Sequence, residues 1–149
     1  MKHRRDIEGL RALAVIAVLL FHFGVPGTRG GYVGVDVFFV ISGFLITSLL
    51  VDERVSTGRI SLRDFYSRRI RRLLPISAVV LVATAISAVA WLEPTRLSNL
   101  ARDIGAASIF SVNFIFANRG TDYSASALPP SPIQHYWSLA VEEQFYMVW

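Results

Sequence analysis

Long uncharged apolar stretches alternate along this chain with short charged or glycine-rich segments. Residues 12–28, 37–51 and 73–92 carry no formal charge and consist mostly of Leu, Val, Ile, Ala and Phe. A helix needs roughly 20 predominantly apolar residues to cross the hydrocarbon core of a bilayer. The pattern therefore predicts three membrane helices, the first two of which are completed by their flanking residues.

Two further apolar stretches are harder to interpret. Residues 104–118 are uncharged but short, which fits a tilted span, a re-entrant segment or a helix buried among the others. Residues 135–149 predict a helix that no Gly, Pro or polar cluster stops before the last residue. We therefore expect an all-α, polytopic transmembrane helix bundle that is incomplete, its fifth helix being truncated.

The segments between the apolar stretches predict the direction in which the expected helices cross the membrane. Residues 24–33 are rich in Gly and Pro, so the first two helices should form a tight antiparallel hairpin. Four basic residues lie in residues 1–11 and seven in the loop expected at 52–72, but only Arg29 lies in the turn. The N-terminus and the Arg-rich loop should therefore face the cytoplasm. A cleaved signal peptide is disfavoured, because acidic residues precede the first apolar stretch and no small-residue cleavage site follows it.

Composition supports a membrane setting. Of the 149 residues, 53% are hydrophobic and 17% charged, which leaves too little polar surface for a soluble domain. The formal net charge of +4 lies beside apolar spans, where membrane orientation explains it better than a nucleic-acid partner. The chain has no Cys, which excludes disulfides, thiolate catalysis and Cys-based metal sites, and we expect no metal.

Arg11 and His22 are the first candidate functional pair. Eleven helical steps separate them, which brings them within roughly 20° of one face and about 16 Å apart along the axis. That face would carry a cation at its cytoplasmic end and a titratable base near its outer end. The alternative is structural: Arg11 reaches lipid phosphate and His22 bonds a neighbouring helix.

Two carboxylates are candidates to assist His22, and a third is a separate site candidate. Asp36 follows the outward turn that His22 precedes, so a simple hairpin predicts similar depths for the two. A carboxylate beside an imidazole fixes its tautomer and stabilises the protonated ring, as a general base requires. Glu142 competes with Asp36 for this role, Glu143 is a further buried candidate, and a purely structural polar pair is the alternative.

A cluster of arginines suggests a second function. Arg68, Arg69, Arg71 and Arg72 offer planar forks of donors that suit a polyphosphate, and Arg68 and Arg72 share a helical face. The alternative is positive-inside charge that contacts anionic lipid. Pro75 is tolerated near a helix start, which predicts that the cluster lies at the cytoplasmic mouth of the third span.

The last predicted helix carries a polar stripe of His135, Ser138 and Glu142 at positions i, i+3 and i+7. These residue types invite a hydrolase-triad interpretation. Side chains on one helix face point the same way and rarely converge on one reacting atom, so we do not favour it.

Four motifs together resemble the acyltransferase 3 family of integral membrane proteins. They are Arg11 with His22 as R-x10-H; residues 31–39 running into Ser42-Gly43-Phe44-Leu45-Ile46; Arg68-Arg69-x-x-Arg72-x-x-Pro75; and residues 135–146. They follow the family's order over most of the chain.

The resemblance implies transfer of an acyl group, with acetyl the group expected, from cytoplasmic acyl-CoA (acetyl-CoA) to a hydroxyl of an envelope or extracellular glycan such as lipopolysaccharide. It implies that His22 is catalytic, that the arginines at 11, 68, 69 and 72 lie near the donor, and that no cofactor is tightly bound. Residues 1–149 would be the N-terminal part of the domain in a bacterial plasma membrane, inactive without further helices. A transporter of an acylated molecule and a non-enzymatic assembly component are the rival classes.

Overall fold

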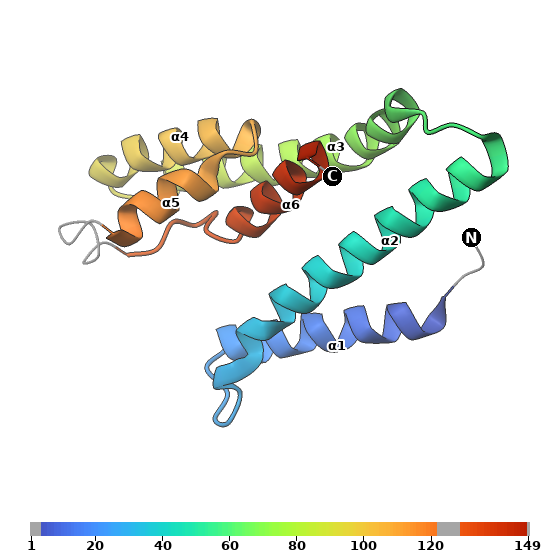
Figure 1. The fold of residues 1–149 in the computed structure, drawn as a ribbon. Helices are drawn as coiled ribbons and strands as arrows, with labels where there is room; N and C mark the ends of the chain where they lie inside the picture. Colours follow the sequence, from blue (N-terminus) through green and yellow to red (C-terminus); the bar gives the residue numbers. More distant parts are fainter. Residues whose placement is uncertain (1–3, 122–128, 149) are drawn as a thin grey trace. The chain divides into compact units, whose positions relative to one another are not determined.

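The structure of the protein, a computed structural model, describes residues 4–121 and 129–148, and the regular elements in those ranges are all helical (Figure 1). The all-α prediction is confirmed. The elements are α1 (Arg5–His22), η1 (Arg29–Tyr32), α2 (Val33–Thr57), α3 (Leu62–Trp91), α4 (Pro94–Ser108), α5 (Val112–Thr121) and α6 (Tyr136–Val148). The chain divides into two compact units, residues 1–62 and 63–149, which are described separately.

The first unit is a helical hairpin in which α1 packs against the start of α2. Gly24 and Gly27 in the turn have φ of 65° and 87°, a region that suits glycine, and Pro26 lies between them. This turn ends α1 at His22, so the first apolar helix is shorter than the 12–28 stretch suggests.

Two glycines allow the helices of the hairpin to approach closely. A Cβ placed on Gly34 would lie 2.5 Å from the carbonyl oxygen of Ala14 and 2.8 Å from Cγ2 of Val18. A Cβ on Gly31 would likewise collide with the carbonyl oxygen of Ala17. Backbone therefore packs directly on backbone here, as is common where small residues line helix contacts in membranes.

Two segments in the described residues are long and apolar enough to cross a membrane, Arg29–Thr57 and Leu62–Trp91, in agreement with two of the three expected spans. The first expected span does not meet that standard. Its uncharged helical part, residues 12–22, rises only about 16 Å, roughly half the thickness of a bilayer core.

The stretch at 104–118 is not one helix. α4 ends at Ser108, Phe110 takes a positive φ of 53°, and α5 begins at Val112. The alternative of a single tilted span at 104–118 is therefore wrong. Ala107 and Val112, on either side of the break, are almost fully buried, so two helices pack among the others here where the buried alternative had expected one.

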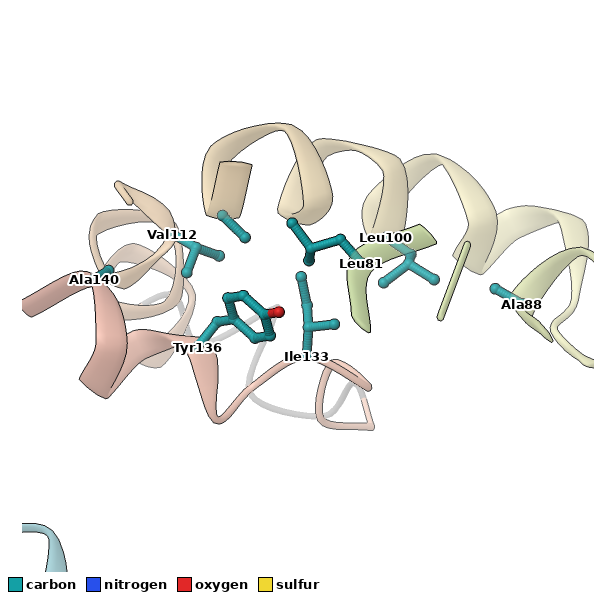
Figure 2. Close-up of a cluster of buried hydrophobic side chains, with 8 residues drawn as sticks. Leu81, Ala88, Leu100, Val112, Ile133, Tyr136 and Ala140 are labelled. Atoms are coloured by element: carbon teal, nitrogen blue, oxygen red, sulfur yellow. The ribbon is translucent and has the colours of Figure 1, made fainter. Parts of the chain in front are cut away.

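The core of the second unit is built from all four of its helices (Figure 2). Its buried members are Leu81 and Ala88 of α3, Leu100 and Ala107 of α4, Val112 of α5, Ile133, and Tyr136 and Ala140 of α6. The hydroxyl of Tyr136 donates a hydrogen bond of 3.1 Å to the carbonyl of Ser77. That bond joins the start of α6 to the middle of α3.

The arginine cluster lies on a helix, whereas a loop was expected at 52–72. α2 continues to Thr57, where Gly58 ends it with a φ of 75°, and α3 begins four residues later at Leu62. The cluster therefore occupies the second and third turns of α3. Pro75 lies inside this helix rather than at its start.

Candidate functional site

His22 ends α1 with one ring nitrogen already bonded. Its Nδ1 lies 2.8 Å from the carbonyl oxygen of Val18, and its ring meets that of Phe21 edge to face at 5.5 Å. A carbonyl oxygen can only accept, so the neutral imidazole must carry its hydrogen on Nδ1. Nε2 is then the basic nitrogen, and the exposed side chain leaves it accessible.

Arg11 and His22 share a face, as the spacing predicts. Both are exposed, and both flank the stripe of α1 that includes Ala14 and Val18 and packs on α2. The edge of the hairpin therefore presents a cation about one third of the way along α1 and an imidazole at its C-terminal end, about 16 Å apart along the axis.

Asp36 does not meet His22. Gly34 packs on Ala14 and Val18, so Asp36 lies near the level of Ala14, about 12 Å along α1 from His22. Two residues along α2 also turn Asp36 about 200° from Gly34, so it faces away from α1. The expectation of similar depth is not met, because η1 and the turn take up the residues that a simple hairpin would have placed in α2. The carbonyl of Val18 holds the tautomer instead.

Two other polar groups of this unit have defined surroundings. Arg4 donates hydrogen bonds of 2.6 to 3.2 Å to the carboxylate of Asp6, and these bonds lower the pKa of Asp6 to about 2. Asp6 is therefore ionised and balances Arg4 at neutral pH. Ser42, in the middle of α2, is half-buried.

Arg69 turns inward from the arginine cluster and binds α6. Its guanidinium contacts the carboxylate of Glu143 at 2.7 to 3.0 Å and lies 3.6 Å from that of Glu142. Its Cζ lies 3.5 Å from the ring centroid of Tyr146, whose hydroxyl donates a 2.6 Å bond to Glu142. We call Arg69, Glu142, Glu143 and Tyr146 the α3–α6 cluster.

Arg68, Arg71 and Arg72 remain exposed on α3. Arg68 and Arg72 lie one helical turn apart and so share a face. The sequence motif therefore divides into two parts: Arg69 joins helices, and its neighbours present positive charge to the surroundings.

The polar stripe of α6 is not a triad. Ser138 donates its hydroxyl to the backbone carbonyl of His135 at 3.0 Å, not to the ring, and His135 is exposed beside Tyr136. Glu142 belongs to the α3–α6 cluster.

One ion pair has no signal in the sequence pattern. Arg119 of α5 binds the carboxylate of Asp103 of α4 at 2.7 and 2.9 Å, and Asp103 is only 1% exposed. The two residues meet because the chain reverses at Phe110, a reversal that periodicity does not show. No grouping of three or more His, Asp or Glu suited to a metal ion occurs in the part of the chain that the structure describes.

Comparison with known proteins gives the site a context. Residues 4–149 match a family domain described as an acyltransferase domain. The chain is 42% identical over 148 residues to the peptidoglycan O-acetyltransferase OatA of Listeria monocytogenes, covering 99% of this chain and 24% of that protein. It is 39% identical over 142 residues to the O-acetyltransferase OatA of Staphylococcus aureus, covering 95% and 23% respectively. The chain thus spans about a quarter of the length of these relatives, and no solved structure matches it.

Proposed function

We propose that this chain, which belongs to the acyltransferase 3 family, forms the N-terminal part of a membrane O-acetyltransferase. The whole protein would move an acetyl group from cytoplasmic acetyl-CoA to a hydroxyl of peptidoglycan or another envelope glycan. The observation that carries the proposal is the likeness, along almost the whole chain, to two O-acetyltransferases, one of which is named for peptidoglycan.

His22 acts as the general base in this proposal. Its Nδ1–H bond to Val18 leaves Nε2 ready to take the proton of an acceptor hydroxyl. The hydroxyl oxygen then attacks the thioester carbon, the carbon–sulfur bond breaks, and the imidazolium returns the proton to the sulfur of CoA. A covalent acetyl-histidine is a second route to the same products.

The arginines bind the donor in this proposal. Arg68 and Arg72 suit the phosphates of CoA, because each exposed guanidinium offers a planar fork of donors. Arg11 lies on the face of α1 that leads toward His22, and it attracts the negative charge of CoA that Arg68 and Arg72 leave unbalanced. Arg69 contributes by holding α6 through Glu143.

Replacing His22 with Ala in the full-length protein tests the proposal. We expect acetyl transfer and release of free CoA in the presence of glycan to disappear, while acetyl-CoA binding persists, because the base is lost and the arginines remain. The measurements are CoA release and donor affinity in detergent or nanodiscs. Arg29→Ala is the control variant, since Arg29 is also exposed in this hairpin and belongs to none of the four motifs.

Normal turnover by the His22→Ala variant would refute the role of His22. Wild-type protein that binds acetyl-CoA but never releases CoA with any glycan would favour a transporter.

A further inference from the structure

A pocket of about 280 Å³ lies in the second unit, apart from the α3–α6 cluster. Its polar and aromatic lining comes from α4, α5 and the segment before α6, and includes Arg96, Asn99, Asp103, Phe116, Arg119 and Ser131. Neither the family motifs nor the proposed chemistry uses these residues.

Two buried oxygens in this lining have hydrogen-bonding capacity left over. Asp103 is balanced in charge by Arg119, yet its Oδ1 receives no hydrogen bond of proper geometry from the described residues, although Nη2 of Arg119 lies 2.7 Å away. The hydroxyl of Ser131 is likewise buried and has no hydrogen-bond partner in the described ranges. Buried polar atoms normally have partners, so both oxygens point to a bound polar molecule.

The pocket lies at the C-terminal end of α3, and this position indicates the side of a membrane on which the pocket is expected. Leu92, one residue past the end of α3, lines the pocket, whereas Arg72 lies near the start of that helix. Twenty residues separate the two, a rise of about 30 Å if helical, so the arginine cluster and the pocket lie at opposite ends of the apolar stretch of α3. Since the arginine cluster is expected on the cytoplasmic side, the pocket is expected on the outer side.

We propose that this pocket binds one sugar unit of the glycan acceptor, an inference that rests on the proposed function. Sugar hydroxyls both donate and accept. They would donate to Oδ1 of Asp103 and to Ser131, and accept from the side chains of Asn99 and Arg96.

The shape and charge of the pocket fit the same ligand. Its volume is at the lower end for ligand sites, which suits a single ring and not a longer chain. The ring of Phe116 offers an apolar surface for the C–H face of a pyranose. Asp103 and Arg119 neutralise each other, so Arg96 gives the pocket lining a net positive charge. Such a pocket suits neutral or acidic sugars.

The experiment measures binding of a soluble disaccharide of N-acetylglucosamine and N-acetylmuramic acid to the full-length protein in nanodiscs without donor. We expect Arg96→Gln and Asn99→Ala each to weaken binding roughly tenfold, because each removes a hydrogen bond to the sugar. KM for the acceptor should rise by a similar factor, with KM for acetyl-CoA and the maximal rate unchanged. Arg102→Gln is the matched control, since Arg102 is exposed on α4 and does not line the pocket.

Thermal unfolding of each variant separates a binding defect from a folding defect. Because Arg96 and Asn99 lie outside the buried core, we expect wild-type stability. Disaccharide affinity unchanged in both variants would overturn the pocket proposal even if transfer is normal. Binding that depends on Arg96 and Asn99 in a protein that transfers no acetyl group would instead overturn the proposed function and support the pocket as a glycan site.

Discussion

At the scale of single residues, the partner of His22 is a backbone carbonyl. Sequence could single out His22, and it suggested Asp36 as the group that orients the ring. It could not show the bond to Val18, because every residue of a helix has a carbonyl and only the rotamer of His22 selects one. Asp36 was misplaced because the length of a turn in residues does not reveal how many of them are helical.

Arg69 and Glu143 were also singled out from the sequence, but for separate roles. They lie 74 residues apart, and they meet because the core, the bond from Tyr136 to α3 and a 2.7 Å bond from the hydroxyl of Tyr66 to the carbonyl of Tyr146 hold α6 against α3. Long-range pairing of this kind depends on packing, which composition and periodicity do not specify.

Arg69 and Arg72 should therefore respond differently to replacement by Ala. Arg69→Ala leaves the poorly exposed carboxylate of Glu143 without its partner, and we expect a loss of about 2 kcal/mol in the free energy of unfolding. Arg72→Ala should leave stability unchanged and raise KM for acetyl-CoA about tenfold, because a charged hydrogen bond to phosphate is lost. Thermal unfolding in detergent and donor titration measure the two effects.

The double variant Arg69→Gln with Glu143→Gln is the control for the ion pair. It should be more stable than Arg69→Ala, since no charge is left without its partner. Equal stability of Arg69→Ala and wild-type protein would show that the pair does not hold α6.

At the scale of helices, hydrophobic runs predicted where helices occur better than where they end. Helices do occur at the runs 37–51, 73–92 and 135–149, but α2 and α3 extend well beyond theirs, α1 ends at His22, and the run at 104–118 divides at Phe110. A run of apolar residues indicates that the segment is removed from water, and a buried turn is removed from water as well as a helix is. A break without Gly or Pro therefore leaves no mark in the pattern.

The close contact between α1 and α2 depends on the absence of a side chain at Gly34. Gly34→Ala should destabilise the hairpin by about 1–3 kcal/mol, because the added methyl group collides with the backbone of Ala14. Gly43→Ala is the matched control in the same helix, since a Cβ there meets nothing within 4 Å and alanine favours the helix. Unfolding of both variants in detergent measures the difference.

A hairpin that tolerates Gly34→Ala as well as Gly43→Ala would contradict the close packing. Loss of activity in Gly34→Ala at normal stability would instead indicate that the spacing of α1 and α2 serves the position of His22.

At the scale of the whole molecule, the distribution of charge predicts orientation. The region from Arg54 to Arg72 should be cytoplasmic, and the region after Trp91 should face outward. Because this chain has no Cys, a single introduced cysteine is a clean probe once any cysteines elsewhere in the full-length protein are replaced.

Ser98→Cys and Ser56→Cys, both at exposed positions, test this orientation. In intact cells we expect a membrane-impermeant maleimide to label Ser98→Cys at once and Ser56→Cys only after permeabilisation. Labelling of Ser56→Cys alone in sealed cells would reverse the assignment of the pocket and the arginine cluster to their sides. Labelling of both variants would show that the two positions do not lie on opposite sides.

Pro75, inside α3, has a consequence for the lipid around the protein. Proline has no N–H, so the carbonyl of Arg71 lacks its helical partner and needs water or another donor. The hydrocarbon-covered part of α3 can then begin only near Pro75, and from there to Trp91 the helix rises about 24 Å, against about 30 Å for a typical bilayer core. Such a mismatch draws the two leaflets together beside α3. In the proposed reaction, a thinned bilayer would shorten the insulating layer between the acetyl-CoA thioester on one side and the acceptor sugar on the other.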